Sequence, residues 1–344
     1  MKPQNTNTKL SLIQSNGIWK GDELSAHLHW KVHLSEEDVL ELEAAVKNTK
    51  ATPLLELSKE RFVLPTLGKK MLEIQENLED SIGATLLSGF PVERFDEETA
   101  QRIFWGICQH IGTPVSQSAK GERIFSVRNE GYGDGDNRQR GPNTNRKLSF
   151  HSDRSDVIAF LCWKQAKTGG ENQLVSSLAL HNAILERRPD LLEQLYLPYY
   201  YKRHNVDQGN ALPWCRQPIF SITDGKFACN ILRVLIDRAY DLEELPDMTP
   251  LQREALDFVE ETASDPSLHY AFRQKPGDML FLNNFTVLHR RSGFEDFEEP
   301  EKRRHIFRIW LSVPNSRPLD PLFKENYGAV EAGALRGGMK AKVE

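Results

Sequence analysis

Apolar and polar residues follow two different periods in the first third of the chain. Residues 26–34, "AHLHWKVHL", alternate strictly, which predicts a half-buried strand. Ser35 and Asp38 then have the spacing of a capping box, so a helix is expected to follow. Helical spacing returns over 68–80 and over 96–112, "DEETAQRIFWGICQHIG", where acidic residues occupy the first turn and a glycine ends the segment. This part of the chain therefore predicts a helical layer.

After residue 147 the pattern changes to short β-type runs separated by turn residues. Helical stretches interrupt them at about 178–196 and 250–263, the second with Thr249 placed as N-cap and Pro250 in the first helical position. Many short strands between turns are typical of a double-sheet jelly roll rather than of a doubly wound parallel sheet. We therefore expect a mostly β protein whose double-stranded β-helix (jelly-roll, cupin-like) core is flanked by α-helices. The strands are expected at 149–163, 173–177, 199–203, 218–223, 226–231, 268–273, 278–283, 286–289 and 304–312.

The domain organisation follows from where these patterns start and stop. Residues 129–146 are polar and rich in glycine, which predicts a long loop of the kind that often forms a lid. The chain has no clear linker after this loop. We expect a flexible arm over 1–22 and a single domain over 23–344, with its helical layer at 35–112 and its jelly-roll core at 147–315.

Composition and charge narrow the class of partner. The 344 residues are 39% hydrophobic and 27% charged with a net charge of -5, so the chain lacks the basic footprint of a nucleic-acid or membrane-surface protein. Its four cysteines lie far apart and suggest no disulfide framework. The N-terminus is polar and no run of about 18 apolar residues occurs. We expect a cytoplasmic protein with a small-molecule partner. These observations are also compatible with a homo-oligomer.

A candidate metal site begins in "KLSFHSDRSDVIAF", residues 147–160. In a regular strand His151 and Asp153 share one face, whereas Asp156 has the opposite parity. An H-x-D pair is common by chance, but one imidazole and one carboxylate are also two of the three ligands in the two-His, one-carboxylate triad of non-haem Fe(II) enzymes. His289, in "PGDMLFLNNFTVLHRRSGF", is the candidate third ligand.

A positively charged group is expected beside these ligands. In "RRHIFRIWLS", Arg304, Ile306 and Arg308 share one face of a strand, and His305 points the other way. A guanidinium fork on that face would bind a carboxylate through two hydrogen bonds.

These segments, in this order, resemble the TauD/TfdA (taurine dioxygenase-like) family of Fe(II)- and 2-oxoglutarate-dependent dioxygenases. The resemblance runs from residue 83 to residue 312 and rests on "FHSDRSD", "KTGGENQLVSS", "PGDMLFLNN" and "RRHIFR". It implies that His151, Asp153 and His289 bind the iron and act as the catalytic centre.

The resemblance also implies roles for residues around the iron. Arg308 matches the arginine that pairs with the distal carboxylate of 2-oxoglutarate, and Asn172 stands where the family has a threonine that touches the same co-substrate. Arg304 matches the position that holds the anionic group of taurine. Apart from the resemblance, Arg138, Arg140 and Asn145 in the loop over 129–146 are candidate lid contacts, and Asn145 is also a candidate substrate contact. The implied reaction uses O2 and hydroxylates an unactivated C–H bond of a small anionic or amino-acid-like molecule, with release of succinate and CO2.

Alternatives remain open at this stage. A cupin-type jelly-roll metalloprotein, an isomerase or hydrolase that does not use 2-oxoglutarate, would need the same three ligands but not Arg308. A binding module without catalysis would not need the complete ligand set. His27, His29 and His33 share the polar face of the first predicted strand, but without a carboxylate beside them a solvated face explains them better.

Overall fold

The computed structural model describes residues 10–132 and 141–340. Parts of the predicted arm and of the predicted loop, including the candidate lid contacts Arg138 and Arg140, lie outside the described residues. No helix in the described part of the chain is long and apolar enough to cross a membrane.

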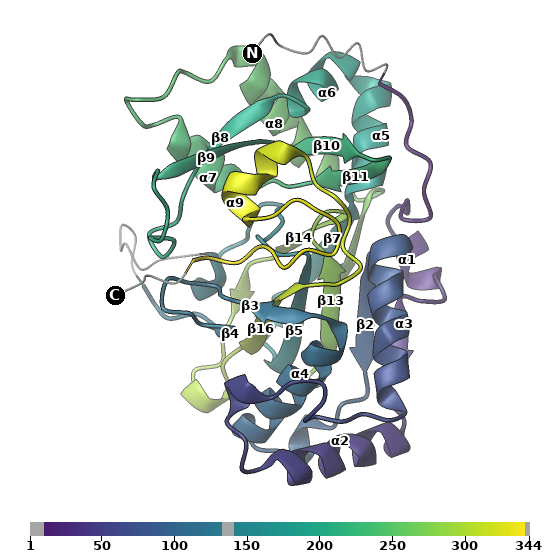
Figure 1. Ribbon diagram of the computed structural model, residues 1–344. Coiled ribbons are helices and arrows are strands. Elements are labelled where there is room, and N and C mark those ends of the chain that lie inside the picture. Colours follow the sequence, from purple (N-terminus) through teal and green to yellow (C-terminus); the bar gives the residue numbers. More distant parts are fainter. Residues whose placement is uncertain (1–9, 133–140, 341–344) are drawn as a thin grey trace.

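The helical layer forms where the sequence predicts it. Its helices are α2 (Glu36–Thr49), α3 (Leu67–Asp80) and α4 (Glu97–Ile111), and α2 starts with the predicted capping box. They pack on one side of the large sheet (Figure 1), and their apolar faces share one core with its strands. The remaining helices are α1 (Glu23–Ala26), α5 (Ser177–Arg187), α6 (Pro189–Leu195), α7 (Arg233–Ala239), α8 (Pro250–Ala263) and α9 (Lys324–Tyr327), with 3-10 turns at Leu54–Glu56, Val92–Arg94, Gly141–Asn143, Pro300–Lys302 and Pro321–Phe323.

The predicted strand over 26–34 is wrong for most of its length. Regular pairing covers only β1 (Lys31–His33), since α1 and a turn take up the preceding residues. His27 and His29 lie in that turn, whereas His33 contacts Ser88, so the three histidines share no face. The alternating run is short, and a helix and a turn form there in place of an extended strand.

Two sheets form the jelly roll. The large sheet has the order β1-β2-β13-β5-β16-β3, with β4 paired to β16, and the smaller facing sheet has the order β12-β7-β14. The strands of the large sheet are β2 (Ala84–Ser88), β3 (Thr113–Val115), β4 (Ile124–Val127), β5 (Val157–Lys164), β13 (Met279–Asn283) and β16 (His305–Ser312). Those of the smaller sheet are β7 (Asn172–Ser176), β12 (His269–Phe272) and β14 (Val287–Arg291). Every residue of β13 and β16 is buried, which explains their nearly continuous apolar runs.

Three further pairs of strands complete the β structure. They are β8 (Pro198–Lys202) with β9 (Trp214–Pro218), β10 (Phe220–Thr223) with β11 (Lys226–Cys229), and β6 (Thr168–Gly169) with β15 (Phe294–Glu295). The first two pairs join α5, α6 and α8 around a second core. The C-terminal segment after β16 runs across the middle of the molecule, between the large sheet and these pairs (Figure 1).

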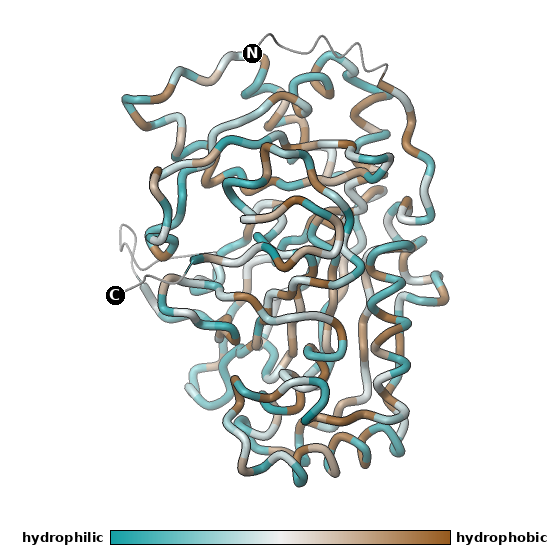
Figure 2. Tube along the Cα trace, in the orientation of Figure 1, coloured by the Kyte–Doolittle hydropathy of each residue, from teal (hydrophilic) through white to brown (hydrophobic). Residues whose placement is uncertain are grey.

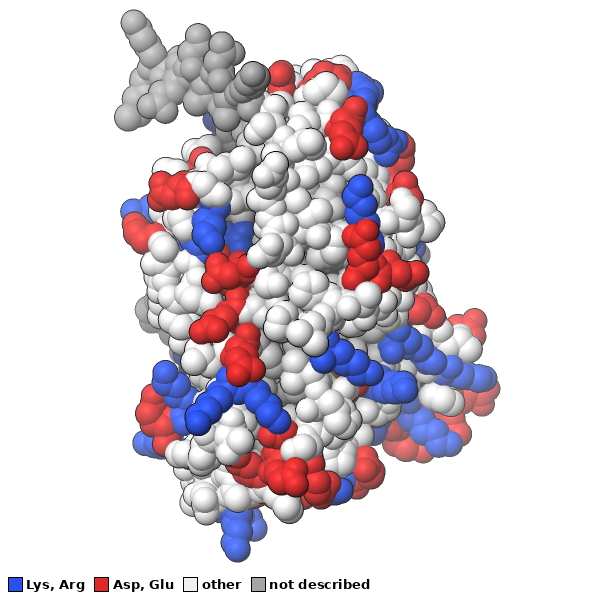
Figure 3. Space-filling model, turned by 90° about the vertical axis from the view of Figure 1, so that its right-hand side faces the viewer, with Lys and Arg blue, Asp and Glu red and all other residues white. Residues whose placement is uncertain are grey.

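The surface and the interior divide as expected for a globular fold. Hydrophobic positions concentrate on the central strands and on the inner sides of the helices, and hydrophilic ones on the outer loops (Figure 2). On the face drawn in Figure 3, side chains of both charge signs are interspersed. That face has no single-sign patch of the kind that binds nucleic acid.

Candidate metal and co-substrate site

The two candidate histidines lie side by side across a pair of backbone hydrogen bonds. His151 N donates to His289 O (3.0 Å), His289 N donates to His151 O (2.9 Å), and the ring centroids are 4.5 Å apart. The predicted strand over 149–163 is wrong in its first half, because regular pairing begins only at Val157. Asp153 therefore reaches the histidines from a loop, and not through the strand alternation on which the prediction relied.

Asp153 completes the group. One ligand atom each of His151, Asp153 and His289 lies within 4.8 Å of the other two, and these residues are called the triad below. Asp153 N donates to Asn284 Oδ1 (3.0 Å), and Asn284 Nδ2 donates to Ser155 O (3.1 Å). The turn between β13 and β14 thus fixes the loop that carries the carboxylate. Within the part of the chain that the structure describes, no other such group of metal-ligating side chains occurs.

Both imidazoles are suited to bind a metal. His151 Nδ1 lies 2.9 Å from Ser149 O and donates to this carbonyl, so Nε2 is the nitrogen available as a metal ligand. Burial, reinforced by the neighbouring His151, lowers the pKa of His289 to about 3, which keeps this ring neutral at pH 7. His289 Nδ1 is buried and has no hydrogen-bond partner among the described residues. Metal binding requires a neutral imidazole of this kind.

The carboxylate of the triad is held in its charged form. Burial opposes its ionisation, but nearby positive charge, chiefly that of the Arg308 guanidinium, outweighs that effect and lowers the pKa of Asp153. Arg308 Nη1 lies 3.3 Å from Asp153 Oδ2, and Arg308 Nε donates to Gln117 Oε1 (2.7 Å). Arg308 Nη2 is buried without a partner in the described structure. One guanidinium donor is therefore free beside the triad.

Two cavities adjoin the triad. The smaller has a volume of about 60 Å³ and is lined by Asn172, Arg304, Ile306 and Arg308, which confirms that the last three share a face. The larger has a volume of about 280 Å³, which is enough for a small molecule, and Arg308 lines it too. Apolar side chains form much of its wall, among them Leu148, Tyr201, Leu232, Val234, Trp310 and Met339.

Of the two cavities beside the triad, Arg304 lines only the smaller. Its guanidinium lies over the ring of Phe294, 5.2 Å from the centroid, and its Nε and Nη1 atoms are buried without partners among the described residues. Asn172 lines the same cavity and donates through Nδ2 to Gln274 Oε1 (3.1 Å). Asn145 lies elsewhere: it is exposed, its carbonyl accepts from Phe294 N, and it lines neither cavity.

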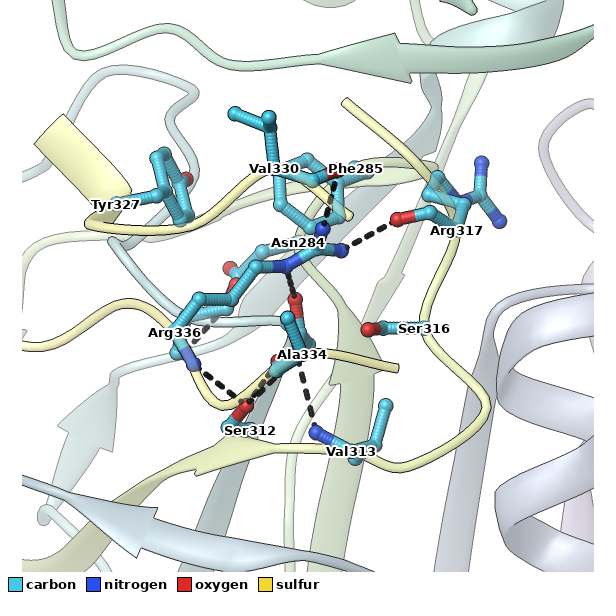
Figure 4. A network of polar contacts seen from close by, with 12 residues as sticks. Asn284, Phe285, Ser312, Val313, Ser316, Arg317, Tyr327, Val330, Ala334 and Arg336 are labelled. Carbon is cyan, nitrogen blue, oxygen red and sulfur yellow. Dashed lines mark hydrogen bonds and ion pairs between the residues drawn. The ribbon is translucent and has the colours of Figure 1, made fainter. Parts of the chain in front are cut away.

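Asp156 stays out of the triad, as its parity suggested, and binds the C-terminal segment instead. Arg336 Nε donates to Asp156 Oδ1 (2.7 Å), while Asp156 Oδ2 accepts from Val313 N (2.9 Å) and from Ser312 Oγ (3.2 Å). Figure 4 shows the Arg336 side chain among Ser312, Val313 and Arg317. The loop that follows Asp153 is therefore held from two sides, by Asn284 and by Arg336.

Comparisons with known proteins agree with this site. Residues 48–310 match the model of the family described as taurine catabolism dioxygenase TauD, TfdA family. The chain belongs to the TauD/TfdA family. The FR-33289 synthase of Streptomyces rubellomurinus is 30% identical over 94% of this chain and 96% of that protein. A taurine hydroxylase-like protein of Stachybotrys chartarum is also 30% identical, over 90% of this chain and 84% of that protein.

Solved structures of non-haem iron oxygenases share the fold of this family member. Asparagine oxygenase with Fe(II), 3-hydroxyasparagine and succinate superposes with a TM-score of 0.64 at 14% identity, covering 82% of this chain and 93% of that one. The oxygenase OrfP with Fe, succinate and hydroxyarginine gives 0.63 at 12% identity, over 82% and 94%. The predicted family and jelly-roll fold are confirmed.

Family membership settles the class of reaction. The protein is an Fe(II)- and 2-oxoglutarate-dependent dioxygenase, an oxidoreductase, and the alternatives of a cupin-type isomerase or hydrolase and of an idle binding module are set aside. The residues present fit these groups, because the donor set suits Fe(II) and unpaired buried guanidinium nitrogens suit a dicarboxylate.

Gln117, Asn284 and Arg336 support the site but were not predicted. Gln117 and Arg336 lie far from the ligand motifs in sequence, so no spacing signals them. Asn284 lies inside "PGDMLFLNN", where nothing in the local pattern singled it out. Only the folded sheet brings them to the triad.

Proposed function

We propose that the triad binds the Fe(II) ion and that the enzyme hydroxylates an unactivated C–H bond of a small anionic or amino-acid-like molecule, releasing succinate and CO2. The observation that carries this proposal is the position of the triad, with three ligand atoms within 4.8 Å between two cavities. Two imidazoles and one carboxylate leave positions open on the metal. When bound there, the iron and 2-oxoglutarate supply oxidising power that protein side chains lack.

We further propose that Arg304 and Asn172 bind the distal carboxylate of 2-oxoglutarate, which exchanges the two arginine roles expected from the sequence. That carboxylate lies at the far end of a five-carbon chain, so its partner must stand away from the metal ligands. Arg308 contacts Asp153 directly, whereas Arg304 stands four residues earlier, roughly 13 Å along an extended chain. Arg304 also has unpaired buried donors, Nε and Nη1, that a carboxylate would satisfy.

The remaining residues near the triad would position groups and exclude water. Arg308 keeps Asp153 charged, has an unpaired Nη2, and lines the larger cavity, where the substrate would lie. Asn284 holds the backbone of Asp153 while ligands exchange at the metal. Trp310 and Met339 cover part of the cavity wall and keep the reacting C–H bond away from bulk water.

The substrate class rests on the charge at this cavity and on the neighbours. Arg308 offers a free donor to an anionic group. The asparagine oxygenase and OrfP structures contain hydroxylated amino acids. Amino acids, sulfonates and aryloxy or fatty-type carboxylic acids are therefore the first compounds to test.

The main test combines spectroscopy with product analysis. Anaerobic addition of Fe(II) and 2-oxoglutarate should produce a visible charge-transfer band, and admission of air with the compound panel should release succinate. Asp153→Ala should abolish the band, while Asp80→Ala, an exposed carboxylate paired with Lys226, should retain it. A band that survives Asp153→Ala unchanged would refute the ligand assignment.

The two arginines are separated by their effects on two Michaelis constants. Arg304→Ala should raise KM for 2-oxoglutarate by roughly 10- to 100-fold, the loss expected for a charged hydrogen bond, with little change in the substrate KM. Arg308→Ala should instead raise KM for the substrate. The reverse pattern would restore the roles expected from the sequence.

A further inference from the structure

We propose that the larger cavity contains a second anion-binding position at Arg154, so that the substrate combines an apolar body with an oxyanion group held there. The inference rests on the proposed function, because it concerns the substrate of the same site. The oxyanion is a carboxylate, sulfonate or phosphonate, all of which a guanidinium binds through paired hydrogen bonds.

Arg154 is a buried side chain with unused donors. Its side chain is 12% exposed and lines the larger cavity. Nη1 donates to Asp207 Oδ2 (2.8 Å) and to Asn326 Oδ1 (2.7 Å), which fixes the plane of the guanidinium. Nε is buried and has no partner among the described residues. An unpaired charged donor in a buried site is costly, so a ligand that pairs with it gains affinity.

The charge around Arg154 is not balanced by the protein. Asp207 Oδ2 accepts from both Arg154 and Arg203 (3.3 Å), so one carboxylate serves two guanidinium groups. Asp207 Oδ1 is taken by Asn210 Nδ2 (2.7 Å). Each nitrogen of the Arg203 guanidinium makes a hydrogen bond, Nη1 to Asp207 and the others to the carbonyls of Leu212 and Glu325. Arg154 and Arg203 therefore share one carboxylate, and Arg154 Nε is left without a partner among the described residues.

Arg233 in the same cavity shows the contrasting case. It pairs with Asp237 (2.8 Å) and with Asp257 (2.8 Å), so two carboxylates balance one guanidinium. Its charge is fully compensated by the protein. Of these two cavity arginines, only Arg154 is undercompensated.

The C-terminal segment builds this position. Asn326 orients Arg154 Nη1, Gly338 N donates to Arg154 O (2.8 Å), and Met339 lines the cavity. All three residues follow residue 310, where the match to the family model ends. Arg154 and Asp207 lie within the region that the family model covers, and residues beyond that region complete the subsite.

The test measures ligand binding without turnover. The enzyme is loaded anaerobically with Fe(II) and saturating 2-oxoglutarate, and isothermal calorimetry follows phenylacetate, phenylmethanesulfonate, benzylphosphonate and the neutral isostere phenylacetamide. At least one anion should bind tenfold or more tightly than the amide, and the three anions identify the preferred oxyanion. Arg154→Gln should weaken that anion by about 10- to 100-fold and leave the amide unchanged.

Three further variants make the result specific. Arg154→Lys keeps the charge but loses the paired donors of the guanidinium, so its affinity for the anion should lie between those of wild type and Arg154→Gln. Asn326→Ala should weaken anion binding less than Arg154→Gln. Arg94→Gln removes the same charge from an exposed pair with Glu36 and should bind like wild type.

The outcomes separate this inference from the proposed function. Anions that bind no better than the amide, or that bind Arg154→Gln as tightly as wild type, overturn the inference while the 2-oxoglutarate band remains. Absence of the band in the wild-type enzyme would instead refute the proposed function. If Arg154→Gln fails to fold, the anion affinities of Arg154→Lys and Asn326→Ala are used instead. Weaker binding by both variants supports the inference, and wild-type affinity in both overturns it.

Discussion

Replacement of Arg336 by methionine is the strongest test of how the C-terminal segment is anchored. The Arg336 side chain is completely buried, with its Nε 2.7 Å from Asp156 Oδ1. Its Nη2 donates to the carbonyl of Arg317 (2.7 Å), and its guanidinium lies over the ring of Phe285 (Figure 4). Methionine fills similar space but leaves the Asp156 carboxylate buried without its countercharge.

The expected cost follows from that unpaired charge. Removal of one partner of a buried ion pair typically destabilises a protein by about 3–5 kcal/mol. For a chain of this size, that loss lowers Tm by roughly 4–7 °C. Since Asp156 O accepts from Asn284 N, which lies beside the loop of Asp153, metal affinity should fall as well.

Urea denaturation and calorimetry of the variant give the measurement, and a double variant gives the control. Asp156→Leu with Arg336→Met removes both charges and should recover part of the lost stability. Arg94→Met, at an exposed ion pair, should leave Tm nearly unchanged. If Arg336→Met costs less than about 1 kcal/mol, or if the double variant is less stable than Arg336→Met, the pair does not anchor the segment as described.

Three other predictions test the packing around the site. Burial and nearby positive charges lower the pKa of His305 to about 4, below its ordinary 6.5. Between these pH values the unfolded chain binds more protons than the folded one, so the free energy of unfolding falls as the pH drops from 6.5 to 4. His305→Gln should flatten this slope in urea titrations. Gly277→Ala should destabilise the protein by more than about 1 kcal/mol and so lower the urea midpoint, because φ is +92° and a Cβ would clash with the carbonyl oxygen of Phe90. An unchanged midpoint would contradict this. Burial raises the pKa of Cys162 to about 12 and of Cys215 to about 11, so a thiol reagent should label the native protein far more slowly than the urea-unfolded chain.

The sequence predicted the elements whose signals are local. The capping box at Ser35, the N-cap at Thr249, and the strands around residues 278–283 and 304–312 appear where they were expected. The two-residue strands β6 and β15 were missed because such short pairings leave no periodic pattern. Pairing with a partner distant in the sequence creates them, and a single sequence does not display that partner.

The site was predictable in its residue types but not in its geometry. His151 and Asp153 meet His289, although the strand alternation used to place them does not exist at residues 151–153. The loop that replaces it is held by Asn284 and by the C-terminal segment, through long-range hydrogen bonds whose pairing a single sequence does not display. For the same reason the sequence could not tell which arginine lies closer to Asp153.

The hydrogen-bonded bridge between His151 and His289 has a mechanical consequence. His289 belongs to the smaller sheet, whereas the loop of His151 and Asp153 leads into β5 of the large sheet. A metal ion held by all three would therefore act as a cross-link that closes a loop of 138 positions and fastens one sheet to the other. Its free energy of binding would then oppose separation of the two sheets. Chelation should speed amide hydrogen exchange in β7 and β14 before it affects the helical layer.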